Sequence, residues 1–329
     1  MSKRLLIVGA FAAIYLLWGS TYLAIALGLK SIPPFLLMGI RSLGGGLVLI
    51  ALNGRALTRM SQRSWLNAAI CGVLFFVGCH GVLAYAQQSV PSGVAAIVLA
   101  TIPFWLLLID FLYPQTRRPK VTTLAALLPG LAGVAIVAWQ SARQAHFSLL
   151  PIILLLGAAL SWAVGTVWSR RTSNRESPTL AAGMQLSIGG VVLLAISLAS
   201  GELEGLSPHH VSEVSFAAAI YLAIAGSVIG FTAFRWLLDN VSTFMVSTYI
   251  FVNPIIAVLL GTLVLGEPLS IAMLFAGLLV IVSVIVTWRA EQAAPSPPEP
   301  AQPPRLPFTA DLRPPRRTST ISCAGHFRA

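Results

Sequence analysis

The side chains that could do chemistry in this chain are few, and most of them are aromatic or carry a hydroxyl or an amide. Several occur in pairs four residues apart, a spacing that places both members on one face of a helix. The pairs are Trp18 and Tyr22, Thr101 and Trp105, Trp162 and Thr166, and Tyr249 and Asn253. Aromatic walls with a few hydroxyl and amide groups suit a small amphipathic solute. These residues predict a solute cavity; the alternative is that Trp and Tyr pack helices or anchor span ends.

Three ionisable side chains fall within apolar stretches, where such groups are costly and need a partner or a purpose. Arg41 could bind a substrate carboxylate through two parallel N–H donors, or it could snorkel or pair inside the protein and fix helix packing. His80 titrates near neutral pH and could exchange protons; the alternative is a neutral imidazole bonded to a neighbouring helix. Asp110 lies near a basic cluster, which favours an ion pair over a proton site.

The elements that position these side chains are predicted to be transmembrane helices. The 329 residues are 57% hydrophobic and 9% charged, whereas a soluble domain carries about 25% charged residues. Apolar runs long enough to cross a hydrocarbon core of about 30 Å recur along the chain. We expect an all-α polytopic membrane protein with ten spans, and barrel strands are excluded because the runs are continuous. The predicted spans are 5–27, 34–52, 65–86, 91–113, 122–140, 148–168, 178–200, 214–237, 241–265 and 269–288.

The distribution of Lys and Arg predicts the orientation. Twelve basic residues fall on one side of the predicted spans, and only Lys30 and Arg143 fall on the other. Cytoplasmic loops are enriched in Lys and Arg, so both termini are expected in the cytoplasm. The net charge of +11 lies in these short clusters and in the tail, so nucleic-acid binding is not expected. Nine prolines between 295 and 315 predict a disordered tail.

The chain also aligns with itself at an offset of 144 residues, which places Trp18 on Trp162 and Arg41 on Gln185. Further coincidences are Pro34 with Pro178, Gly39 with Gly183, Gly45 with Gly189, Gly46 with Gly190 and, after a small shift, Pro103 with Pro254. We interpret the chain as two five-helix repeats followed by a tail. The ranges are 1–140, 141–290 and 291–329. Since five is odd, the second repeat enters the membrane from the opposite side, the arrangement used for alternating access.

Several short segments, taken in order within this duplicated frame, resemble the drug/metabolite transporter superfamily, of the ten-helix EamA type. They are Trp18 to Tyr22, Ser161-Trp162, Pro34 to Gly46 with Arg41, Thr101 to Pro103, Asn253-Pro254 and Gly266 to Pro268. The resemblance covers about 1–290 and implies a bacterial inner-membrane exporter of amino acids, small metabolites or drugs, with the substrate between the halves. The chain departs from the family's more usual acidic residue at the end of the fourth span, because Asp110 lies slightly earlier.

The sequence therefore predicts a secondary active transporter that exports a small amphipathic metabolite, amino acid or drug. Its expected partners are the solute and the lipid bilayer, with proton coupling implied by the resemblance and by His80. The expected cavity residues are Trp18, Tyr22, Arg41, His80, Thr101, Trp105, Trp162, Thr166, Gln185, Tyr249 and Asn253. The alternatives are a channel-like pore and an intramembrane enzyme. No H-E-x-x-H, G-x-S-x-G or G-x-x-x-x-G-K-[ST] segment occurs, and we expect no catalytic site, cofactor or metal.

Overall fold

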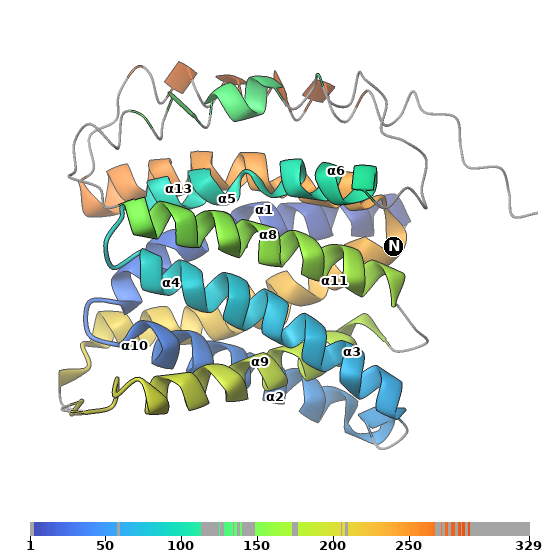
Figure 1. The fold of residues 1–329 in the computed structure, drawn as a ribbon, viewed down its shortest axis with the longest axis vertical. Helices are drawn as coiled ribbons and strands as arrows, with labels where there is room; N and C mark the ends of the chain where they lie inside the picture. The colour runs from blue at the N-terminus through green and yellow to red at the C-terminus, as the bar shows by residue number, and fades with distance from the viewer. Residues whose placement is uncertain are drawn as a thin grey trace, which may run out of the picture. The chain divides into compact units, whose positions relative to one another are not determined.

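The computed structural model describes residues 3–57, 60–112, 149–172, 177–204, 206–207 and 210–266, with isolated residues and short stretches within 125–139 and 271–289. The chain divides into a helical unit, Met1–Ala293, and a tail, Ala294–Ala329. The predicted disordered tail lies outside the described residues. Regular structure in the described part is helical, and that part contains no strand (Figure 1).

The helices follow the predicted spans closely. In the first part of the chain they are α1 (Lys3–Gly28), α2 (Pro34–Leu57), α3 (Gln62–Gly72), the π-helical segment η1 (Val73–Gly81), α4 (Val82–Ala86), α5 (Ser92–Leu99) and α6 (Ile102–Leu112). In the second part they are α8 (Leu149–Arg171), α9 (Pro178–Ala199), α10 (Glu213–Tyr221), the π-helical segment η3 (Leu222–Phe231), α11 (Thr232–Asn240), α12 (Thr243–Ser247) and α13 (Tyr249–Leu265).

Seven helical stretches within the described residues are long and apolar enough to cross a membrane. They are Lys3–Gly28, Pro34–Asn53, Gln62–Ala86, Leu150–Arg171, Pro178–Ala199, Glu213–Asn240 and Met245–Leu265. Each corresponds to a predicted span. The predicted spans 122–140 and 269–288 lie largely outside the described residues, so the count of ten stays a prediction.

The predicted span 91–113 is interrupted in the structure, because α5 ends at Leu99 and α6 begins at Ile102, within the apolar stretch Ser92–Leu106. Pro103 is the reason. It has no backbone N–H, and its ring conflicts with the carbonyl four residues earlier, at Leu99. The hydroxyl of Thr101 donates to the carbonyl of Val98 over 2.7 Å at the break. The described part of this predicted span therefore consists of two short helices, and the span itself stays a prediction.

Helices α2 and α9 pack side by side through small residues (Figure 1). Their glycine contacts are Gly39 with Leu194, Leu43 with Gly190, Gly46 with Ser187, and Ile50 with Gly183. Moving forward along α2 moves the contact backward along α9, so the two helices are antiparallel. A Cβ on Gly46 would lie 2.6 Å from the backbone nitrogen of Ser187, which shows that glycine is needed for this close approach.

The two π-helical segments lie in the middle of long helices and pack against both halves of the chain. Segment η1 contacts α8 and α9, while η3 contacts α1 and α2. A π-helix is rare and is often found at functional sites. The two segments therefore mark the region where a site is expected.

Candidate solute-binding site

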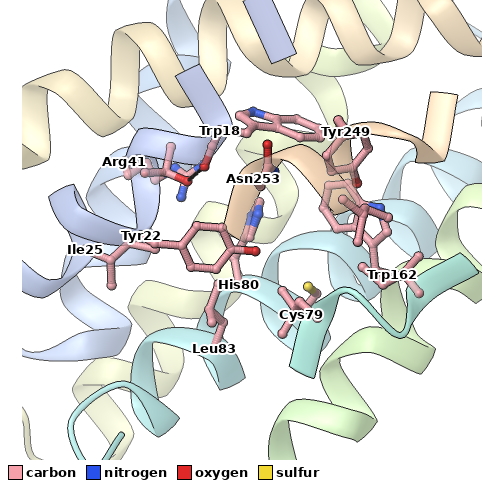
Figure 2. Close-up of a pocket in the computed structure, with 14 residues that line it drawn as sticks. Trp18, Tyr22, Ile25, Arg41, Cys79, His80, Leu83, Trp162, Tyr249 and Asn253 are labelled. Atoms are coloured by element: carbon pink, nitrogen blue, oxygen red, sulfur yellow. Dashed lines mark hydrogen bonds between the residues drawn. The ribbon is translucent and has the colours of Figure 1, made fainter. Parts of the chain in front are cut away.

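A cavity lies between the helices of the described unit and is lined from both parts of the chain (Figure 2). Its walls are Trp18, Thr21, Tyr22 and Ile25 of α1, Arg41 of α2, Cys79 and His80 of η1, Leu83, Leu99, Ile102, Trp162 of α8, and Tyr249, Ile250 and Asn253 of α13. The cavity volume, measured as the space that the centre of a water molecule can occupy, is about 30 Å³. That is room for about two waters, whereas pockets for drug-sized ligands measure roughly 300–1,000 Å³. The space in this structure is therefore smaller than a drug-sized solute needs.

The structure brings most of the expected cavity residues together. Those lining the cavity are Trp18, Tyr22, Arg41, His80, Trp162, Tyr249 and Asn253. Thr101, Trp105, Thr166 and Gln185 do not line it. The Thr166 hydroxyl instead donates to the carbonyl of Trp162 over 2.8 Å, and Thr101 bonds within its own helix break.

Aromatic rings from both halves meet at Trp18. Its ring lies edge-on to Trp162, with centroids 5.5 Å apart, and to Tyr249, with centroids 4.9 Å apart. Phe234 packs at 5.2 Å. Such edge-to-face pairs add about 0.5–1.5 kcal/mol each beyond burial. The apolar part of the site is therefore a rigid wall of rings.

Hydrogen bonds orient the Trp18 and Asn253 side chains. The indole Nε1 of Trp18 donates to the carbonyl of Gly226 in η3 over 2.9 Å, and both groups are buried. The Asn253 amide nitrogen, in the orientation that satisfies its surroundings, donates to the carbonyls of Tyr249 at 3.1 Å and Tyr15 at 3.3 Å. These bonds join α1 to η3 and to α13.

Arg41 is the charged group of the cavity and is only 2% exposed. Its Nε donates to the hydroxyl of Ser227 in η3 over 3.1 Å, and Nη1 lies 3.7 Å from the sulfur of Met38. The Ser227 hydroxyl in turn donates to the carbonyl of Leu222 over 3.2 Å. The guanidinium is thus fixed against η3 at one wall of the cavity (Figure 2).

His80 lies between Phe76 and Trp162, with ring centroids 5.4 and 5.3 Å away. Its Nδ1 is buried and has no hydrogen-bond partner among the residues that the structure describes. The expected alternative, an imidazole bonded to a neighbouring helix, has no support at this nitrogen. This nitrogen can therefore bond a polar group that enters the cavity.

Gln185, the repeat counterpart of Arg41, lines a second and smaller cavity of about 20 Å³. Arg235, 4% exposed, lines the same cavity and donates to the hydroxyl of Ser169. The Oε1 of Gln185 and the Nδ2 of Asn67 are buried here with no partner in the described part of the chain. The two repeat-related positions therefore serve different cavities.

Several lining residues were missed by the sequence analysis. They are Thr21, Ile25, Cys79, Leu83, Leu99, Ile102 and Ile250. Thr21 and Ile25 are recognisable in retrospect, because together with Trp18 and Tyr22 they follow the three- and four-residue spacing of one helix face. The others are ordinary apolar residues and a single cysteine, whose types carry no signal in an apolar chain.

Comparisons with known proteins show the family to which the chain belongs. The EamA-like transporter family model matches residues 5–139 and again 149–289. The chain is 37% identical to the "Uncharacterized inner membrane transporter YedA" of Escherichia coli over 285 residues, which cover 85% of this chain and 90% of that protein. It is 27% identical to "Protein PecM" of Dickeya dadantii, covering 84% of this chain and 93% of the other.

A solved crystal structure of a protein shares the fold, with a TM-score of 0.70 and 23% identity, covering 88% of this chain and 99% of that one. The relatives named as transporters and the apolar helices together make this a multi-pass membrane protein. The chain belongs to the EamA-like transporter family, whose activity is the transport of small molecules across membranes.

Proposed function

We propose that this protein is a secondary active transporter of the inner membrane that exports a small amphipathic metabolite, amino acid or drug. It works by alternating access between two inverted five-helix repeats, 1–140 and 141–290, that make up the ten spans. Both termini lie in the cytoplasm, the side on which the twelve basic residues gather. The tail 291–329 stays outside the repeats.

The packing of α2 on α9 supports the inverted repeat. At the offset of 144 residues, the contact of Gly46 with Ser187 maps onto that of Gly190 with Leu43. The Gly39 contact maps onto the Gly183 contact in the same way. Antiparallel helices that exchange their contacts under one rotation are related by a two-fold axis perpendicular to them, and such an axis lies in the membrane plane.

The packing on the π-helical segments supports the same axis. A Cβ on Gly45 would lie 2.8 Å from the Cβ of Ser227 in η3. A Cβ on Gly189, the counterpart of Gly45, would lie 2.6 Å from the Cβ of Phe76 in η1. The shift that aligns Pro103 with Pro254 also aligns Phe76 with Ser227. Helix α2 thus meets η3 as α9 meets η1.

The single observation that carries the proposal is the cavity itself. It takes walls from both repeats, with Trp18 against Trp162, and its volume is about 30 Å³. A solute can occupy such a site only when the halves move apart. Rocking of one repeat against the other would open it to each side in turn.

Counterflow in proteoliposomes tests this proposal. Vesicles holding the full-length protein are loaded with an unlabelled probe, and accumulation of the same labelled probe is measured. The panel is indole-3-propionate, L-tryptophan, L-leucine, tryptamine and ethidium. Saturable accumulation of at least one probe is expected. Equilibration without accumulation indicates a channel-like pore, covalent change of a probe indicates an enzyme, and no flux of any probe overturns the proposal.

A matched pair of tryptophans on α8 tests the site. Trp162 lines the cavity and is 3% exposed, whereas Trp168 on the same helix is 39% exposed. Trp162→Ala should lower counterflow about tenfold, because it removes several ring contacts of roughly 0.5–1.5 kcal/mol each. Trp168→Ala should keep it. Equal losses would show that the cavity is not the transport site.

Proton coupling is part of the proposal and is supported by the position of His80 in the cavity wall. Export should then drive proton movement in the opposite direction, so an imposed pH gradient should accelerate probe efflux. His80→Gln should remove that acceleration, so that efflux of the probe is the same with and without the pH gradient. An efflux rate that ignores the gradient in the unsubstituted protein would remove the proton from the mechanism.

A further inference from the structure

We infer that the solute of this cavity is an amphipathic carboxylate without an ammonium group, held with its carboxylate on Arg41 and its apolar body against Trp18, Trp162 and Tyr249. The inference rests on the proposed function and names the substrate class of the same site. It follows from how Arg41 is buried, from the polar groups beside it and from the charges that the cavity lacks among its described residues.

The first observation is a buried cation with no carboxylate on the described cavity walls. Arg41 is 2% exposed. The acidic side chains that the structure describes are Glu202, Glu204, Glu213 and Asp239, and none of them lines the cavity. Burying an unpaired charge is unfavourable, and proteins usually compensate it with an opposite charge. The solute is the natural source of that charge.

The second observation is that the guanidinium still has free donors. An arginine carries five N–H donors in a planar fork, and the bonds of Arg41 within the described residues use Nε and Nη1 only. Its Nη2 lies beside Gly226, where an added Cβ would be 3.1 Å away. Two parallel N–H groups match the two oxygens of a carboxylate.

The third observation is a second hydrogen-bond donor in the cavity wall. Tyr22 lines the same cavity, and its hydroxyl points into the middle of the labelled side chains (Figure 2). A phenol can donate its proton to an anion. The cavity wall therefore holds donors for an anion in Arg41 and Tyr22, while its described residues include no carboxylate for an ammonium group.

An aromatic cage can instead select cations, because ring faces attract positive charge. Arg41 weighs against this choice here. Two positive charges close together inside a protein repel each other more strongly than in water. The counterpart of Arg41 in the second repeat, Gln185, is neutral and lines the other cavity. With His80 neutral, the described walls of the first cavity therefore offer one positive charge, that of Arg41, to one carboxylate.

Four ligands with the same indole body test the inference. Binding of indole-3-propionate, indole-3-propionamide, L-tryptophan and tryptamine to the full-length protein in nanodiscs is measured by calorimetry at neutral pH. The carboxylate should bind about tenfold or more tighter than the amide, because a hydrogen bond to a charged group is stronger than a neutral one. Tryptophan should bind more weakly than the carboxylate, and tryptamine should bind weakest. An amide or amine that binds as tightly as the carboxylate overturns the inference.

Variants test whether Arg41 causes the preference for the carboxylate over the amide. Arg41→Gln should make the carboxylate and the amide bind equally, and Arg41→Lys should keep part of the preference because the charge remains without the fork. Lys30→Gln removes the same charge at an exposed site and should leave the preference intact. Melting of each ligand-free variant reports its folding, and an Arg41→Gln variant that keeps the preference also overturns the inference.

The outcomes separate this inference from the proposed function. Saturable counterflow of any probe, with no preference for carboxylates, keeps the transporter and rejects the carboxylate. Selective binding of the carboxylate that depends on Arg41, without counterflow, keeps the site and rejects transport.

Discussion

The two π-helical segments are built alike but serve the cavity differently. In each, a glycine makes room for a donor from the neighbouring long helix, and that donor bonds the carbonyl four residues before the glycine. Ser161 of α8 reaches past Gly78 to the carbonyl of Leu74 in η1 over 2.8 Å. Trp18 of α1 reaches past Gly230 to a carbonyl of η3, that of Gly226. The backbone design is shared, while the side chains are not.

The difference lies in what each segment presents to the site. Segment η1 places His80 and Cys79 in the cavity wall. Segment η3 contributes no side chain to that wall and instead positions its neighbours, holding Trp18 through a carbonyl and Arg41 through Ser227. The two segments therefore share a backbone arrangement, while only η1 places side chains in the wall of this cavity.

The largest loss of stability is expected at Gly230, where the Trp18 ring packs directly against the backbone of η3. A Cβ at Gly230 would lie 2.9 Å from Cδ1 of Trp18, and the ring cannot retreat because other aromatic rings surround it. Gly230→Ala should lower the free energy of unfolding by about 2–3 kcal/mol, in the range of overpacked cores. Thermal unfolding in detergent measures this.

Gly78→Ala should be milder, about 1 kcal/mol, because the hydroxyl of Ser161 can rotate away. Gly44→Ala is the matched control, since a Cβ there meets nothing within 4 Å. Equal losses at Gly78 and Gly230 would show that the two segments respond alike despite their different donors.

The second prediction removes the donors themselves. Trp18→Phe keeps a ring but leaves the buried carbonyl of Gly226 without its indole partner, so it should destabilise the protein by about 1–2 kcal/mol. Ser161→Ala affects a part-buried bond and should cost about 0.5–1 kcal/mol. Chemical unfolding of both variants compares them, and a larger loss for Ser161→Ala would reverse the ranking of the segments.

The sequence predicted the positions of the helices better than it predicted their internal breaks and π-helical segments. Seven of the ten predicted spans are matched by described helices that are long and apolar enough to cross a membrane. They were predictable because the length of each apolar run and the Gly, Pro and charged residues between runs fix their positions. The break near Thr101 needed the effect of Pro103 on the preceding turn. The π-helical segments were not foreseen, since their sequences are as apolar as any other span.

The cavity walls were predictable only in part, for a physical reason. A four-residue spacing shows that Trp162 and Thr166 share a helix face, but Thr166 turns its hydroxyl to its own helix. In a membrane, apolar residues face lipid as well as the protein interior, so the pattern does not separate the two sides. The repeat predicted that Gln185 would line the same cavity as Arg41. In the structure Gln185 lines the second cavity instead, and this repeat position carries a neutral amide where the first repeat carries a charged guanidinium.

The third prediction concerns the N-terminal caps of α2 and α9, the helices that pack on η3 and η1. The start of α2 is capped by Glu202, whose carboxylate accepts the backbone N–H groups of Phe35 at 3.1 Å and Leu36 at 2.9 Å. The start of α9 is capped by its own Ser177, over 3.2 Å. Glu202→Ala should cost about 1 kcal/mol of unfolding free energy, measured by thermal melting. Glu204→Ala, at an exposed position, should stay within about 0.5 kcal/mol.

The smallest effect is expected from loosening Arg41 on η3. Ser227→Ala removes the acceptor of the Arg41 Nε and leaves the charge in place, so the protein should fold while the guanidinium loses its fixed orientation. Binding of indole-3-propionate should weaken about threefold, because part of the preorganisation is lost. Ser42→Ala is the control, since the Ser42 hydroxyl is buried beside Arg41 in the chain and has no hydrogen-bond partner among the described residues. If calorimetry shows the same affinity for Ser227→Ala and Ser42→Ala, η3 does not position the cation, and the contrast between the two segments reduces to their packing alone.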